Sequence, residues 1–131
     1  MEYAIGVLLA LAVLGGSTAI GFDRERVFYP SVMIYIAANY ILFATMGAST
    51  HDLILETLAA GAFIAVSAIG YKTTLWLVAA ALAAHGLFDF VHHHIIANPG
   101  VPSWWPGFCL AFDVVAAGYL AVLIRRRPDL K

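Results

Sequence analysis

The sequence has little charge. Only 11% of its residues are Asp, Glu, Lys or Arg, whereas an ordinary soluble domain carries roughly 25%. Hydrophobic residues make up 63% of the chain. A soluble domain of this length leaves much of its surface exposed and could not cover so much apolar area. We therefore expect an integral membrane protein.

Cysteine and positive charge are scarce as well. Cys109 is the one cysteine, which rules out an intrachain disulfide and a CxxC-type metal site. We expect it to pack as a small hydrophobic residue. The formal net charge is -1, and a nucleic-acid partner would require a basic face. We therefore expect no nucleic-acid partner.

Long apolar runs, in contrast, are abundant. A membrane-spanning helix needs about 20 mostly apolar residues, and five stretches approach this length: residues 3–22, 29–48, 53–70, 75–96 and 104–124. The breaks between them are short, so consecutive helices should be antiparallel neighbours. The prediction is an all-α integral membrane protein, with residues 1–131 forming a single domain of five transmembrane helices in a bundle.

One side of this predicted bundle lacks positive charge entirely. Five crossings place every Lys and Arg on the same side, namely Arg24, Arg26, Lys72, Arg125, Arg126, Arg127 and Lys131. The positive-inside rule assigns that side to the cytoplasm. We expect a multi-pass protein of the cell (cytoplasmic) membrane, with its N-terminus outside and its C-terminus in the cytoplasm. Dense small residues indicate close helix packing and leave a homo-oligomer open.

Ionisable residues are concentrated in the stretch HGLFDFVHHH, residues 85–94. At about 100° per residue, Asp89 falls about 40° from His85 and His92 falls about 20° to the other side. These three residues share one stripe of a helix. His93 lies at about 80°, on the shoulder of that stripe, and His94 points the opposite way.

Other predicted helices bring polar residues to the same half of the bundle. His51 lies in the turn before the third helix, and Glu56 lies about one turn inside that helix. Asp113 lies about 13 Å along the fifth helix, at 1.5 Å per residue. The charge rule places all of them toward the non-cytoplasmic side, and ionisable residues inside a membrane mark functional sites.

Histidine and carboxylate side chains in this pattern predict a metal site. Two ligands spaced i, i+3 or i, i+4 on a helix converge on one ion, and imidazoles combined with carboxylates suit zinc or iron. We expect a divalent metal, zinc in preference to iron. The candidate ligands are His85, Asp89, His92, His93 and His51, and Asp113 or Glu56 would act as general base or would orient a ligand. A structural hydrogen-bond network without metal is the main alternative.

Several functions are compatible with such a site. The leading hypothesis is a membrane-embedded, metal-dependent hydrolase, or an oxidase, acting on a lipid or an amphiphilic small molecule. The alternatives are an ion or proton transporter or channel subunit, a haem-binding electron carrier, and a non-catalytic membrane scaffold. The motif HxxxDxxHH matches no metalloprotein signature that would decide between them.

Overall fold

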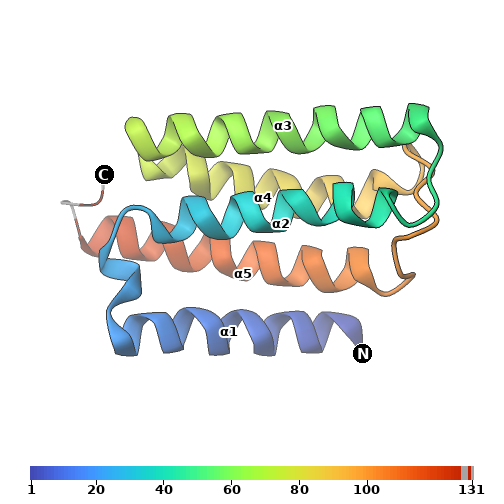
Figure 1. The fold of residues 1–131 in the computed structure, drawn as a ribbon. Helices are drawn as coiled ribbons and strands as arrows, with labels where there is room; N and C mark the ends of the chain where they lie inside the picture. The colour runs from blue at the N-terminus through green and yellow to red at the C-terminus, as the bar shows by residue number, and fades with distance from the viewer. Residues whose placement is uncertain (128–129, 131) are drawn as a thin grey trace.

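The computed structural model describes residues 1–127 and residue 130, and these residues form five α-helices joined by short connections (Figure 1). The helices are α1 (Glu2–Ile20), α2 (Phe28–Ala44), α3 (Thr50–Lys72), α4 (Leu75–His92) and α5 (Trp105–Arg126), with a 3-10 turn, η1 (Phe22–Arg24), between α1 and α2. The prediction of an all-helical chain with five helices is confirmed for the described residues.

Four of these helices, α1, α3, α4 and α5, are long and apolar enough to cross a membrane. Helix α2 has 17 residues, which is the lower limit for a spanning helix. Large apolar side chains point outward along the bundle: Leu8 is 67% exposed, Leu58 is 65% exposed and Leu87 is 63% exposed. Such an apolar surface is consistent with a multi-pass membrane protein.

Local capping residues set the boundaries of α1 and α3. Helix α1 ends at Ile20 because Gly21 takes the left-handed conformation, with φ of 86°, which glycine adopts at low cost. The sequence pattern predicts that this helix ends at residue 22. Helix α3 begins at Thr50 instead of residue 53, because the Ser49 hydroxyl accepts a hydrogen bond from the Asp52 amide and caps the first turn.

Helix α4 ends earlier than the sequence pattern predicts. Its last residue is His92, not residue 96, and the amides of Ile95 and Ile96 both donate to the His92 carbonyl in a tight turn. Helix α2 likewise ends at Ala44, before residue 48. His93 is therefore the C-cap of α4, and His94 lies in the turn beyond it.

Successive helices run antiparallel, so the chain has two ends with different chemistry (Figure 1). One end, the histidine end, holds the N-terminus, the α2–α3 turn and the α4–α5 loop. The other, the basic end, holds η1, the α3–α4 turn and the end of α5. Every described Lys and Arg lies at the basic end, namely Arg24, Arg26, Lys72, Arg125, Arg126 and Arg127. Lys131, the remaining predicted member, lies outside the described residues.

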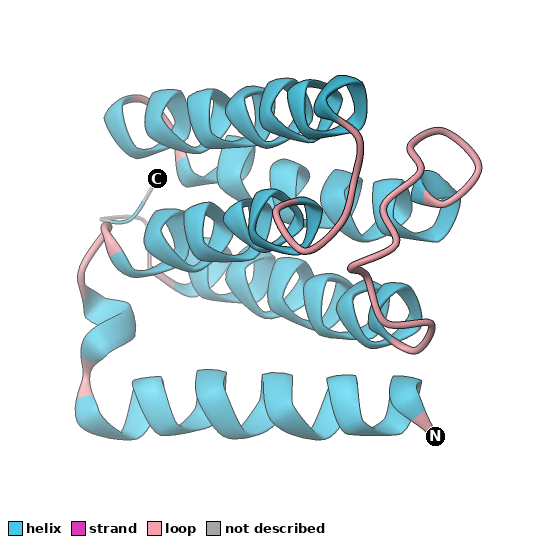
Figure 2. Ribbon diagram, turned by 45° about the vertical axis from the view of Figure 1, so that its right-hand side comes forward, coloured by secondary structure: helices cyan, strands magenta, loops and turns pink. Residues whose placement is uncertain are grey.

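Helix α4 packs against both α3 and α5, and α1 packs on the far side of α5 (Figure 2). Helices α1 and α5 approach closely because Gly6 has no side chain: a Cβ at Gly6 would lie 2.4 Å from the carbonyl oxygen of Phe108. Helix α2 packs mainly on α3. The apolar core runs along the bundle and includes the fully buried Leu14, Met33, Leu82, Leu120 and Ile124.

Candidate metal centre

Three ionisable side chains meet in the interior between α4 and α5. The Nδ1 atom of His85 lies 2.8 Å from Oδ2 of Asp113 and 3.4 Å from Oδ2 of Asp89. His85 is 2% exposed, and Asp89 and Asp113 are both 0% exposed. One potential ligand atom from each residue lies within 4.8 Å of the other two. We call this group the His85 cluster, and its donor atoms could hold a metal ion.

Helix positions explain why these side chains meet. His85 and Asp89 are spaced i, i+4 on α4, so they share one face. His85 lies seven residues and Asp89 three residues before the helix ends at His92, and Asp113 lies eight residues after Trp105 on the antiparallel α5. At 1.5 Å per residue, His85 and Asp113 both lie about 10–12 Å from the histidine end of their helices.

Gly86 permits the close approach of α4 and α5 at this level. A Cβ at Gly86 would lie 3.0 Å from the Cβ of Asp113 and 3.3 Å from the carbonyl oxygen of Leu110. These separations are shorter than an ordinary van der Waals contact. The missing side chain therefore lets α5 bring Asp113 within hydrogen-bonding distance of His85.

The carboxylates of the His85 cluster have few protein donors. No donor among the described residues is well aligned on either oxygen of Asp89 or on Oδ1 of Asp113, although Oδ2 of Asp89 lies 3.4 Å from His85 Nδ1. Buried carboxylate oxygens are costly unless a proton, a donor or a cation compensates them. The cluster thus presents three buried acceptor oxygens that lack a well-aligned donor, beside an imidazole.

Apolar and weakly polar groups surround these acceptors. The Phe63 ring meets the His85 ring edge-on, with centroids 4.8 Å apart. The side chains of Tyr40 and Cys109 both approach the Asp89 carboxylate as donors, although neither makes a well-aligned hydrogen bond to it. This low-polarity shell strengthens any attraction between the carboxylates and a cation.

His92 belongs to a second, separate group nearer the histidine end. Its Nε2 atom lies 2.7 Å from Oε1 of Glu56 on α3, and Asn98 Nδ2 donates to the same oxygen at 2.7 Å. Asn98 Nδ2 also lies 3.1 Å from the Tyr40 carbonyl oxygen. Glu56 and His92 are each 1% exposed. We call these residues the Glu56 group. Its hydrogen bonds attach the loop after α4 to helices α2 and α3.

Tyr40 lies between the two groups. Its ring packs on His92 with centroids 4.2 Å apart, and it is 6.2 Å from the His85 ring. The Tyr40 ring therefore contacts the histidines of both groups.

The other predicted ligands lie outside both groups. The His51 side chain is 79% exposed and lies 3.5 Å from the Asp52 carboxylate. His93 and His94 are exposed, and their rings stack with centroids 3.7 Å apart. His93 is the C-cap of α4, and its exposure shows that it does not share the buried stripe.

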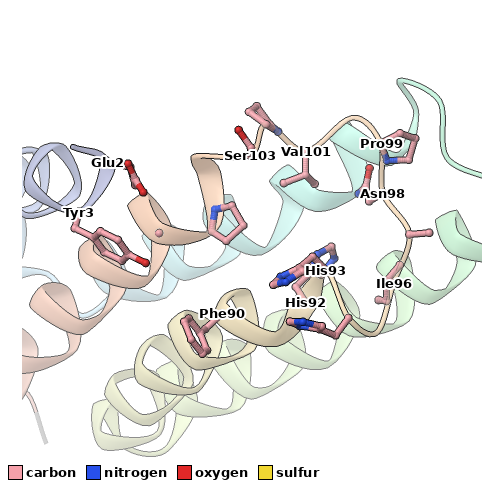
Figure 3. Close-up of a pocket in the computed structure, with 15 residues that line it drawn as sticks. Glu2, Tyr3, Phe90, His92, His93, Ile96, Asn98, Pro99, Val101 and Ser103 are labelled. Carbon is pink, nitrogen blue, oxygen red and sulfur yellow. The ribbon is translucent and has the colours of Figure 1, made fainter.

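A chamber at the histidine end adjoins the Glu56 group. It has a volume of about 950 Å³ and lies between the start of α1, the end of α4 and the α4–α5 loop (Figure 3). His92 and Asn98 form part of its wall, and the exposed His93 and Glu2 also line it. The chamber therefore connects the exterior of the histidine end to the buried Glu56–His92 pair.

The structure thus divides the predicted site residues into three sets. His85 and Asp89, predicted as ligands, lie together with Asp113, predicted as a base. His92, predicted as a ligand, is paired with Glu56, predicted as a base. His51 and His93 join neither.

Sequence reasoning did not identify Gly86, Asn98 or Cys109 as parts of the site. Cys109 carried a usable signal, since it lies four residues before Asp113 and therefore on the same face of α5. Asn98 carried none, because its contacts depend on the path of an irregular loop. No family model, curated protein or solved structure matches the chain.

Proposed function

We propose that this chain is a multi-pass membrane protein whose His85 cluster binds one divalent metal ion, zinc in preference to iron, and that the metal supports hydrolysis of a lipid or amphiphile. The observation that supports the metal is that two buried carboxylates, whose oxygens lack well-aligned donors, converge with the His85 imidazole. Imidazole and carboxylate are the ligands that zinc shares with non-haem iron.

Charge balance supports a divalent ion. With a neutral imidazole, the two carboxylates of the cluster carry a charge of -2 in an interior that excludes water. Unbalanced buried charge costs several kcal/mol per ion, to order of magnitude. A divalent cation makes the cluster neutral, and two protons shared among the three side chains do the same. The site is therefore suited to exchanging two protons for one metal ion.

Three protein ligands favour reaction over a purely structural role. Catalytic zinc sites keep three protein ligands and one position for water or substrate, whereas structural sites are closed by four. A metal held by His85, Asp89 and Asp113 would supply Lewis-acid chemistry, polarising a carbonyl or phosphoryl group and making a nearby water more acidic. In hydrolysis the water oxygen would bond to the attacked carbon or phosphorus and give its proton to a base, the bond from that centre to the leaving group would break, and the leaving group would take up the proton from the base.

The Glu56–His92 pair is suited to receive that proton. The pair is buried and hydrogen-bonded at 2.7 Å, and its His92 side chain lines the chamber at the histidine end. We assign Asp113 as a ligand because its Oδ2 atom is one of the converging donor atoms. Glu56 is then the general base. His93 and His51 are left outside the mechanism.

The substrate class follows from the position of the cluster. About 10–12 Å of helix separates it from the histidine end, and apolar side chains cover the outside of the bundle at that level. A lipid or amphiphile in the bilayer reaches this depth without entering water. The positive-inside rule places the basic end in the cytoplasm and the cluster in the non-cytoplasmic half.

The arrangement supports the alternative functions less well. A transport path would need polar groups between the His85 cluster and the basic end, but the core there is filled by the fully buried Val78, Leu82, Ala116 and Leu120. An axial histidine pair for haem would have to combine His85 with His92 or His51. His92 is held by Glu56, and the side chain of His51 is 79% exposed.

The activity is tested with the purified chain in lipid nanodiscs. The protein is stripped with a chelator, reloaded with zinc, and supplied with ester-, amide- and phosphodiester-linked lipids, and product release is followed by mass spectrometry. We expect one linkage class to be cleaved only by the reloaded protein. Glu56→Gln should retain metal but lose most turnover. Absence of metal-dependent product from all three linkage classes would contradict the hydrolase.

A further inference from the structure

A second cavity lies on the side of the bundle, between α1, α2 and α5. Its volume is about 560 Å³, which lies within the ~300–1,000 Å³ range of small-molecule sites. Apolar side chains dominate its wall, which includes Val13, Val32, Ile36, Phe108, Cys109 and Phe112. We call this cavity the lateral slot.

The slot exists because α1 and α2 pack against different partners. Helix α1 packs on α5, and α2 packs mainly on α3. The close contact at Gly6 holds α1 against α5, so the space beside α2 is left open. Along α2 the wall extends from Phe28 to Asn39, a span of about 16 Å at 1.5 Å per residue. The slot is therefore long in the direction of the helices.

The slot ends beside the His85 cluster. Cys109 lines the slot, is 3% exposed and interacts electrostatically with Asp89 and Asp113. Phe112, also in the wall, directly precedes Asp113. Cys109 lies about 6 Å below the start of α5, and Asn39 lies about 7 Å below the end of α2. Cys109 and Asn39 are therefore at the same level, near the outer end of the slot, whereas the polar Ser31 and Tyr35 lie farther along its wall toward Phe28.

We propose that the lateral slot binds the single hydrocarbon chain of the amphiphilic substrate. The chain lies along α2 toward Phe28, and the polar head lies at the level of Cys109 and Asn39, next to the His85 cluster. This inference rests on the proposed function, because the metal is what gives the bound head group a reaction partner.

The dimensions and surroundings of the slot select this occupant. An α-helix with its side chains is about 10–12 Å across, so a helix of about 16 Å length would need more than twice the volume of the slot. The walls offer no charged side chain, which excludes a charged ligand filling the slot. The slot opens on the apolar flank of the bundle, where hydrocarbon chains are the surrounding solvent.

Photolabelling tests the slot directly. The full chain in phosphatidylcholine nanodiscs is irradiated with a palmitate analogue that carries a diazirine at the end of its chain, and the adducts are mapped by peptide mass spectrometry. We expect adducts to concentrate on the wall of the slot near Phe28, Val32 and Val13. Adducts spread evenly over lipid-facing residues such as Leu8 and Leu58 would overturn the proposal.

Matched variants sharpen the result. Val32→Trp fills the slot and should reduce labelling of its wall by about tenfold, the loss expected when about 1.4 kcal/mol of binding energy is removed. Leu58→Trp places the same bulk on the exposed face of α3, where Leu58 is 65% exposed, and should leave labelling unchanged. Equal labelling in the two variants would contradict the proposal that the lateral slot binds the hydrocarbon chain. If Val32→Trp does not fold, the adduct map of the unaltered chain decides the question.

The metal content of the same nanodisc samples separates the two proposals. A labelled slot in a chain that binds no metal would overturn the proposed function and leave the slot as a lipid site. Bound metal without preferential labelling of the slot would overturn the slot alone. Val32→Trp should retain its metal, because Val32 is not part of the His85 cluster.

Discussion

His85 on α4 and Asp113 on α5 are joined by a 2.8 Å contact between Nδ1 and Oδ2 at the one level where a glycine on α4, Gly86, faces the Cβ of Asp113. This contact links the two helices that carry the candidate metal site. Helix packing and ligand geometry therefore depend on each other at this position.

Gly86→Ala should weaken metal binding. The new methyl group would lie 3.0 Å from the Cβ of Asp113, and relieving such overpacking costs about 1–3 kcal/mol. Moving α5 away from His85 should lower zinc affinity by about tenfold or more, as measured by competition with a fluorescent chelator. Gly118→Ala is the control, because a Cβ at Gly118 meets nothing within 4 Å; it should raise stability by up to ~1 kcal/mol. Equal zinc affinities in both variants would show that helix separation does not set the site.

Metal binding should release two protons. The buried cluster is neutral either with two protons or with one divalent ion, so the logarithm of the apparent zinc affinity should rise with pH with a slope of about 2. Asp89→Asn removes one carboxylate and should reduce the slope to about 1. Calorimetry in buffers of different ionisation enthalpy counts the released protons. A slope near zero in the unaltered chain would contradict binding at this cluster.

Glu56→Leu should loosen the α4–α5 loop without removing the metal. His92 and Asn98 both donate to Oε1 of Glu56 at 2.7 Å, and each buried donor left without its acceptor costs about 1–3 kcal/mol. Hydrogen exchange should increase for residues 93–104. Glu56→Gln keeps an acceptor oxygen and should leave exchange close to that of the unaltered chain. Loss of zinc from Glu56→Leu, with the fold intact, would instead assign Glu56 to the metal site.

The helices could be predicted from the sequence because long apolar runs and charged turns are local features. The boundaries were less accurate, since they depend on capping interactions such as the Ser49 hydroxyl on the Asp52 amide and the turn that ends α4 at His92. Helical phase placed His85, Asp89 and His92 on a buried stripe, and all three are buried. Helical phase could not show that His92 pairs with α3 whereas His85 pairs with α5.

The partners across helices required three-dimensional information. Asp113 lies near His85 because Gly86 lets α4 and α5 approach, and a single sequence does not indicate which glycine faces which helix. Asn98 reaches Glu56 because the loop after α4 folds back over the bundle. The exposure of His93, at the C-cap of α4, and of His51, in the first turn of α3, depends on which neighbouring segments cover them.

The orientation in the membrane can be tested by labelling single cysteines on intact cells. Ser103→Cys lies at the histidine end and Lys72→Cys at the basic end, and both positions are exposed. The positive-inside rule predicts that a membrane-impermeant maleimide labels the first variant and not the second. The unaltered chain is the control, since Cys109 is buried. The reverse pattern would place the His85 cluster on the cytoplasmic side.

The most direct measurement is the metal content of the chain, purified without a histidine tag and without chelators, by inductively coupled plasma mass spectrometry. We predict about one zinc per chain, as expected for a single three-ligand site. His85→Ala with Asp89→Ala should remove this metal. His93→Ala with His94→Ala should retain it, because both of those histidines are exposed. Loss of the metal from the variant His93→Ala with His94→Ala, or a folded chain that binds no metal, would contradict the account.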